Sequence, residues 1–191
     1  DLDGTKQKNK LGANSILAVS IATCKLAAIS KKISLFKYLG GNTNNQMPLP
    51  LMNIINGGAH ANNSLRIQEF MIRPERPKTF SESIRICFLV IQKLKSLINN
   101  KKLSTTVGDE GGFAPSLNTN EEAIEFIIEA IEKSGFKIGE EVSICLDVAA
   151  NELYKESKYS IQSSKFESIE NTIDYYLDLI DKYPIKSIED P

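Results

Sequence analysis

The sequence contains no tryptophan, a single histidine, three cysteines and no excess of either charge. Its 23 basic and 24 acidic side chains give a formal net charge of −1. A nucleic-acid groove or a polybasic membrane surface needs surplus positive charge, so we expect neither kind of partner. We also expect no membrane-spanning helix, because no apolar run approaches the roughly 18 residues that one requires.

The cysteines Cys24, Cys87 and Cys145 are odd in number, far apart and embedded in apolar segments. We interpret them as buried thiols in a reducing compartment, which predicts a cytoplasmic protein. Metal binding by these thiols is not expected, because there is no Cys-x-x-Cys spacing and the only histidine is remote in sequence.

The ends of the sequence suggest part of a longer protein. The chain begins at Asp1 without an initiator methionine, and it ends at Pro191 directly after a strand-like segment. A buried parallel strand needs neighbours on both sides, so we expect this strand to be incomplete without further chain.

Hydrophobic periodicity predicts two domains, residues 1–45 and residues 46–191. The first should hold a largely buried helix over 12–32, followed by the polar linker 40–45. In the second we expect strands at 48–55, 66–73, 143–146 and 185–188, with helices at 80–98, 119–135 and 168–182. Two apolar strands separated by one helix form a βαβ unit, which predicts a parallel sheet and the α/β class.

The helical faces can also be predicted from spacing. In the helix at 80–98 one face should carry Ile84, Cys87, Phe88, Ile91 and Leu94. In the helix at 168–182 the inward residues should be Ile169, Ile173, Tyr176, Leu177 and Ile180, with Asp174, Asp178 and Asp181 outward. Thr119 followed by Glu122 is typical of a capping box at a helix start.

The most informative segment is residues 106–115, where Asp109 and Glu110 lie among glycine, alanine and proline. Glycine leaves room for a ligand to approach closely. An acidic pair in such a loop favours proton transfer or metal chemistry. An ordinary acidic turn is the alternative, because Asp and Gly are common turn residues.

Two further carboxylates, Asp147 and Glu189, directly follow the predicted strands 143–146 and 185–188. The carboxyl ends of parallel strands meet at the edge where α/β proteins bind ligands. Two carboxylates converging there repel each other unless a cation joins them, and oxygen ligands select Mg²⁺, Mn²⁺ or Ca²⁺ over zinc. Alternatively, Asp147 caps the following segment and Glu189 pairs with a basic side chain.

His60 is surrounded by small and amide residues, which favours ligand contact over burial in a core. Gln68 and Glu69 begin an apolar strand, where a charged residue is costly without a partner or a purpose. Structural pairing of Glu69 with Arg66 or Arg73 is the alternative.

Six segments, in the same order along the chain, closely resemble enolase, the phosphopyruvate hydratase of glycolysis. They are LDGT (2–5), LGANSILAVS (11–20), NIINGG (53–58), QEFMI (68–72), VGDEGG (107–112) and SIEDP (187–191). The resemblance implies the first part of an enolase-type β/α barrel, preceded by the helical tail of an α+β cap domain. The loop at Asp109 and Glu110 and the continuous match disfavour another lyase or racemase of that superfamily.

By this resemblance, Glu110 is the proton donor, Asp147 and Glu189 hold Mg²⁺, and His60, Gln68 and Glu69 bind the substrate, 2-phosphoglycerate or phosphoenolpyruvate. The complete protein would be a cytoplasmic homodimer. The base and the third metal carboxylate of enolases have no counterpart in these 191 residues, so the chain alone should be inactive. A truncated, non-catalytic product that acts through surface binding is the alternative. After Asp147 the sequence reads Val148-Ala149-Ala150-Asn151, where the family commonly has a cysteine and serines; this affects packing more than ligation.

Overall fold

The computed structural model describes residues 2–41, 46–108 and 110–191. Residues 42–45 of the predicted linker, and Asp109 of the acidic pair, therefore lie outside the described residues. The chain divides into two compact units, Asp1–Met47 and Pro48–Pro191.

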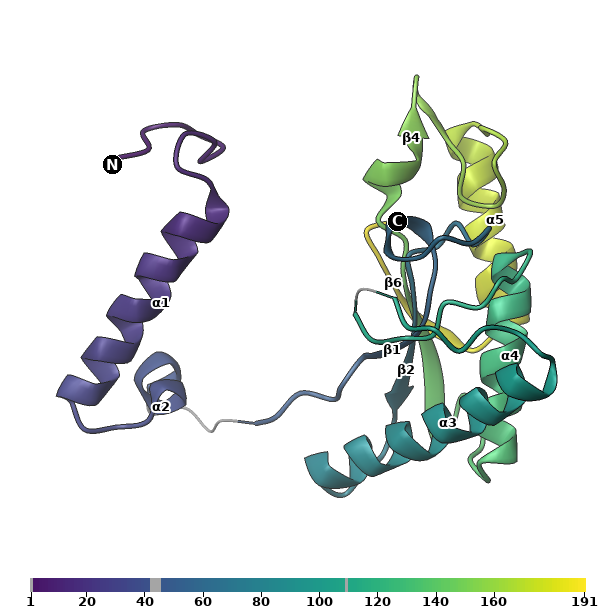
Figure 1. Cartoon of the computed structure of the whole chain (residues 1–191), viewed down its shortest axis with the longest axis horizontal. Helices are drawn as coiled ribbons and strands as arrows, with labels where there is room; N and C mark the ends of the chain where they lie inside the picture. The colour runs from purple at the N-terminus through teal and green to yellow at the C-terminus, as the bar shows by residue number, and fades with distance from the viewer. Residues whose placement is uncertain (1, 42–45, 109) are drawn as a thin grey trace. The chain divides into compact units, whose positions relative to one another are not determined.

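The first unit contains two helices, α1 (Ala13–Ser30) and α2 (Leu35–Gly40) (Figure 1). The carboxylate of Asp3 organises the segment before α1, because it accepts hydrogen bonds from the backbone N–H groups of Thr5 (3.0 Å) and Leu11 (2.7 Å). The prediction of a largely buried helix is wrong for this unit, since Ala28 is the one buried residue of α1. The helix is apolar on most sides, and a single short second helix cannot cover such a surface.

The expectation that no segment could span a membrane needs correction as well. By length and composition alone, Ala13–Ser30 is apolar enough to cross one. This is weak evidence, because the core helix of a soluble protein and a signal sequence pass the same test.

The second unit is built on a four-stranded sheet with the order β1 (Met52–Asn56), β2 (Glu69–Pro74), β3 (Val142–Asp147) and β6 (Ile185–Glu189). The predicted parallel pairing of the last two strands is confirmed, but β2 runs antiparallel to both of its neighbours, so the sheet is mixed. The reason lies in the connections. One helix, α5 (Ile169–Lys182), separates β3 from β6 and returns the chain to the edge where β3 began. Two helices, α3 (Phe80–Asn100) and α4 (Asn120–Lys133), separate β2 from β3 and bring the chain back to the edge that it left.

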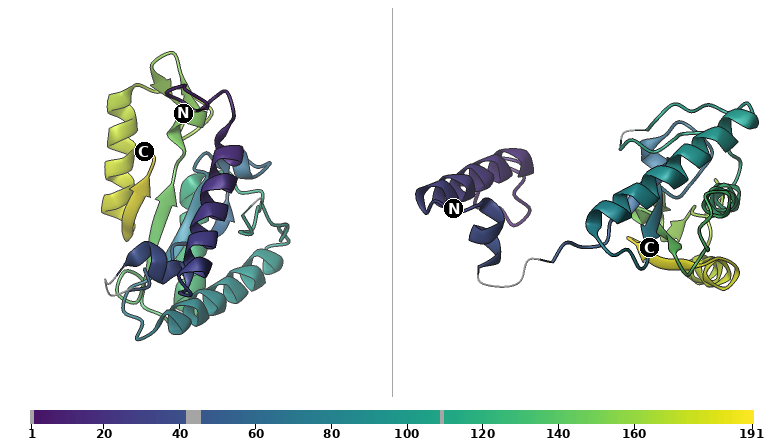
Figure 2. Two further views of the ribbon diagram at one scale, coloured as in Figure 1. Left: turned by 90° about the vertical axis from the view of Figure 1, so that its left-hand side faces the viewer. Right: turned by 90° about the horizontal axis from the view of Figure 1, so that it is seen from below.

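The helix starts follow the sequence closely. The hydroxyl of Thr119 accepts a hydrogen bond from the backbone N–H of Glu122 (3.1 Å), as the capping pattern predicts, and Thr79 caps α3 in the same way. Gly135, with φ +85°, follows the end of α4. Figure 1 shows α4 and α5 on the same side of the sheet, and the right-hand view of Figure 2 shows both almost end-on.

The predicted face of α5 is largely wrong. Its buried residues are Thr172, Tyr175, Tyr176 and Leu179. The four aliphatic residues predicted to point inward are exposed, namely Ile169, Ile173, Leu177 and Ile180. The helix has apolar residues on two faces, and the described residues pack against only one of them. In α3, Cys87 and Leu94 are buried and Ile91 is half-buried as predicted, whereas Ile84 and Phe88 are exposed.

Short elements complete the unit. A 3₁₀ turn at Gly58–His60 follows β1, and another at Ala150–Leu153 follows β3. The latter leads into a hairpin of β4 (Tyr154–Lys155) and β5 (Lys158–Tyr159). Cys87 and Cys145 are buried free thiols as predicted, and Cys24 is half-buried.

Candidate functional site

Four polar residues form a row across the sheet at one edge. In the strand register Asn56 lies opposite Glu69, Glu69 opposite Asp147, and Asp147 opposite Glu189. Neighbouring strands are about 4.8 Å apart, and residues directly opposite each other project from the same face of a sheet. The carboxyl ends of β1, β3 and β6 therefore lie beside the amino end of β2. The carboxylates of Glu69, Asp147 and Glu189 and the amide of Asn56 lie next to one another along this edge.

A loop folds over the β1 end of this row. The backbone N–H of Asn56 donates to the carbonyl of Phe113 (2.8 Å), and the N–H of Phe113 donates to the carbonyl of Ile54 (2.9 Å). Within the loop, the N–H of Gly108 donates to the carbonyl of Gly112 (2.8 Å). Gly108 and Gly112 thus lie together beside β1, and Glu110 lies between these two glycines in the sequence.

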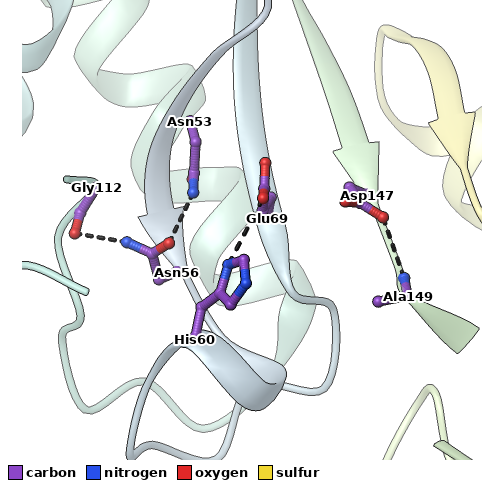
Figure 3. A network of polar contacts seen from close by, with 7 residues as sticks. All are labelled: Asn53, Asn56, His60, Glu69, Gly112, Asp147 and Ala149. Carbon is purple, nitrogen blue, oxygen red and sulfur yellow. Dashed lines mark hydrogen bonds and ion pairs between the residues drawn. The ribbon is translucent and has the colours of Figure 1, made fainter. Parts of the chain in front are cut away.

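Three predicted site residues come together next to the row. His60 Nδ1 lies 3.5 Å from Glu69 Oε1 (Figure 3). The ligand atoms of His60, Glu69 and Glu110 all lie within 4.8 Å of one another. His60 reaches this position because the N–H groups of Gly57 and Gly58 donate to the carbonyls of Gln68 and Leu65, which folds the segment after β1 back onto the start of β2.

Glu69 is an unusual carboxyl group. Its residue is only 9% exposed. Burial is the main cause that raises the pKa of Glu69 to about 8. The hydrogen bond and the negative charge of Glu110 raise it further, as do the charges of Asp147 and Glu189. One proton is therefore retained by this group at neutral pH in the absence of a cation.

Asp147 is half-buried, and its Oδ1 accepts a hydrogen bond from the N–H of Ala149 (3.1 Å; Figure 3). Asp147 thus bonds the segment that follows it, but the 3₁₀ turn at Ala150–Leu153 has no side-chain cap, so the alternative prediction of a cap is met only in part. The second carboxylate oxygen makes no hydrogen bond to another described residue. Burial is the main cause that raises the pKa of Asp147, with further contributions from the charges of Asp190 and Glu110.

The structural alternatives for the two glutamates are not met among the described residues. Arg66 donates to the carbonyl and the hydroxyl of Ser160 (2.8 and 2.6 Å). Arg73 pairs with Glu75 at 2.9 Å. Neither arginine therefore neutralises Glu69. Glu189 forms no ion pair within the described part of the chain.

This excess of negative charge fits a divalent cation. The groups that act electrostatically on Glu69 and Asp147 are carboxylates, apart from His60. Asp147 and Glu189 are register partners on adjacent strands, and both offer hard oxygen ligands of the kind that Mg²⁺ takes. A cation between them would relieve the repulsion that burial intensifies.

Gln68 directly precedes Glu69, the first residue of β2. Its backbone N–H donates to the carbonyl of Asp147 (3.1 Å). It lines a cavity of about 540 Å³ whose walls also include Asn151, Glu152, Tyr159 and Asp190. Sequence reasoning missed the contribution of these residues. It also missed Asn56, which enters the sequence analysis only as part of the segment NIINGG (53–58).

The comparisons with known proteins agree with this architecture. Residues 44–191 match the family model described as the enolase C-terminal TIM barrel domain. The chain belongs to the enolase family. Residues 1–39, which include the helix at Ala13–Ser30, match the enolase N-terminal domain. The enolase of Pelagibacter ubique (strain HTCC1062) is 62% identical over 191 residues, which are 100% of this chain and 46% of that protein. The chain therefore spans about half the length of this relative, and the mixed sheet with its helices is part of an enolase-type barrel.

Proposed function

We propose that the protein containing this chain is a phosphopyruvate hydratase, which interconverts 2-phosphoglycerate and phosphoenolpyruvate with loss of water. Family membership supports this function. The observation that carries it is the row of Glu69, Asp147 and Glu189 at one edge of the sheet, with Glu110 brought against Glu69 by the neighbouring loop.

The reaction removes a proton from the carbon that bears the phosphate and expels the hydroxyl of the neighbouring carbon. The first step places additional negative charge next to a carboxylate. Asp147 and Glu189 would hold Mg²⁺, whose positive charge would stabilise this additional negative charge. His60, Gln68 and Glu69 would line the substrate pocket from the amino end of β2 and from the turn after β1.

Glu110 is the group that we assign to the second step. A hydroxyl leaves far more easily as water than as hydroxide, so an acid must hold a proton at neutral pH. The raised pKa of Glu69 supports this assignment, because it keeps a proton on the carboxyl group that is hydrogen-bonded to Glu110. Glu110 is exposed whereas Glu69 is buried, so Glu110 is the member of the pair that can reach a substrate.

The base that takes the first proton is a lysine in the enolases that the chain resembles. Neither this lysine nor a third metal carboxylate has a counterpart in the 191 residues. We therefore propose that the 191-residue chain alone shows no turnover. By resemblance to enolases, we also propose that the complete gene product is a cytoplasmic homodimer. Dehydration by the purified chain, free of host enolase, would contradict this assignment of roles.

Replacement of Glu110 by Gln in the complete gene product tests the proposal. We expect dehydration to fall by about 10²–10⁴-fold or more, because general acid catalysis has this magnitude and hydroxide is a poor leaving group. Exchange of the substrate proton with solvent should survive, since another residue removes that proton. The matched control is Glu140→Gln, whose side chain is 73% exposed and remote in sequence from the cluster. Equal loss of exchange and dehydration would mean that Glu110 only shapes the loop.

A further inference from the structure

The side chain of Asn56 is completely buried and uses both ends of its amide. Its Oδ1 accepts a hydrogen bond from Asn53 Nδ2 (2.6 Å), and its Nδ2 donates to the carbonyl of Gly112 (2.5 Å), as Figure 3 shows. Leaving a buried polar group without its partner costs more free energy than a typical hydrogen bond contributes. The contact to Gly112 is therefore difficult to break while the strand stays in place.

Both ends of the turn that carries Glu110 pack against this amide. A Cβ atom at Gly108 would lie 2.7 Å from Asn56 Nδ2, and a Cβ atom at Gly112 would also lie 2.7 Å from it. Real Cβ atoms do not approach other atoms this closely, so the two glycines allow the loop to sit directly on the asparagine. Glu110 lies between these two contact points.

The backbone of Asn56 extends this link to the rest of the site. Its partner on the neighbouring strand is Glu69. Asn56 is therefore linked both to the loop and to Glu69, the residue that Glu110 contacts. Its carbonyl accepts a hydrogen bond from Asn63 Nδ2 (3.0 Å), and that same amide donates to the carbonyl of Pro115 (3.1 Å). One buried residue thus connects β1, the loop at 108–112 and the segment that contains His60.

We propose that Asn56 is a positioning residue, whose amide holds the loop at the place where Glu110 meets Glu69. The catalytic part of this inference rests on the proposed function, because it presumes that Glu110 is the acid. In this role Asn56 touches no reacting atom and acts only through the loop.

The first test measures the loop directly by amide hydrogen exchange in the complete gene product. Asn56→Ala should raise exchange at least tenfold at Gly108 and Phe113, whose N–H groups close the turn and attach it to β1. The matched control is Asn120→Ala. Asn120 is equally buried, but its amide bonds the N–H groups of Arg66 and Ile67 and the carbonyl of Ile161, away from this turn.

In this test the control should lose thermal stability without releasing the turn. If Asn56→Ala does not fold, Asn56→Ser removes less volume and serves in its place. Unchanged protection of the turn in a folded Asn56 variant overturns the proposal, whether or not the protein is an enolase.

The second test is a double-mutant cycle on dehydration. Asn56→Ala alone should lower kcat for dehydration at least tenfold while solvent exchange of the substrate proton survives, which is the pattern expected for Glu110→Gln. Combined with Glu110→Gln, it should cause no further loss, because residues that act through one another are not additive. Multiplicative losses would overturn the positioning role. Absence of dehydration in the wild-type gene product would instead contradict the proposed function, and the exchange test would still decide whether Asn56 holds the loop.

Discussion

Raising the pH should destabilise the cation-free protein, and Glu69 should be the main cause. In the unfolded chain a glutamate loses its proton near pH 4.5, whereas the folded protein raises the pKa of Glu69 to about 8. Between these values the folded state holds more protons than the unfolded state. The stabilisation that comes with the protonated form is complete below pH 4.5 and is lost as the pH rises toward 8.

The size of this effect is limited by the number of protons involved. One proton gives a slope of at most about 1.4 kcal/mol per pH unit. Because the structure can relax around the charged form of Glu69, we expect a total loss of about 1–3 kcal/mol between pH 5 and pH 8. The raised pKa of Asp147 acts in the same direction, so some slope should persist at the acid end without Glu69.

Urea unfolding with a chelator present, at half-unit steps from pH 4.5 to 8.5, measures this slope. Glu69→Gln keeps the size of the side chain and removes its titration, so the variant should lose most of the slope above pH 6. Glu129→Gln is the control, because Glu129 is 42% exposed and forms a surface pair with Lys133. Stability that rises with pH in this window, or an unchanged slope in Glu69→Gln, would refute the reasoning.

Two further predictions concern the metal and the backbone. Mg²⁺ at 10 mM should stabilise the complete gene product by about 1.4 kcal/mol at pH 8 if the dissociation constant there is near 1 mM, and by less at pH 5.5. Asp147→Ala should remove this gain in thermal unfolding, and an unchanged gain would exclude Asp147 as a ligand. Gly57→Ala should cost roughly 3 kcal/mol or more in urea unfolding, because the new Cβ would lie 2.4 Å from the carbonyl oxygen of Ile67 and 2.5 Å from the Cβ of Leu65. Gly135→Ala, which meets no atom within 4 Å but has φ +85°, should cost only about 1 kcal/mol, and equal losses in the two variants would contradict the steric argument.

Local signals in the sequence were sufficient for features that depend on few residues. The Thr119 cap needs only a hydroxyl three residues before an N–H, and the parallel pairing of β3 with β6 follows from a single intervening helix. The antiparallel direction of β2 was not predicted. Two helices separate β2 from β3, and the local sequence pattern does not show at which edge of the sheet the chain enters the next strand. The convergence of Glu69 with Asp147 depends on that direction.

Other features depend on which surface finds a partner, and periodicity cannot decide this. In α5 the pattern permits two apolar faces, and the face with Tyr175 and Leu179 is the buried one. Ile173 and Leu177 remain exposed because the described residues offer nothing to cover them. Asn56 was overlooked for a related reason. An asparagine before two glycines is typical of a turn, and only the fold places its amide against residues more than fifty positions away.

The row of carboxylates also explains why this edge of the sheet favours reactivity over stability. Burial raises the free energy of each ionised group, and every neighbouring carboxylate raises it further, as the pKa of Glu69 indicates. A core selected only for stability would place an arginine here, yet Arg66 and Arg73 bond elsewhere. The sheet registers and the Asn56–Gly112 contact hold the groups together despite their repulsion. Groups with strongly shifted pKa values that are held in this way are characteristic of functional sites. Binding of a ligand or a cation offsets the repulsion between the carboxylates and so stabilises the site.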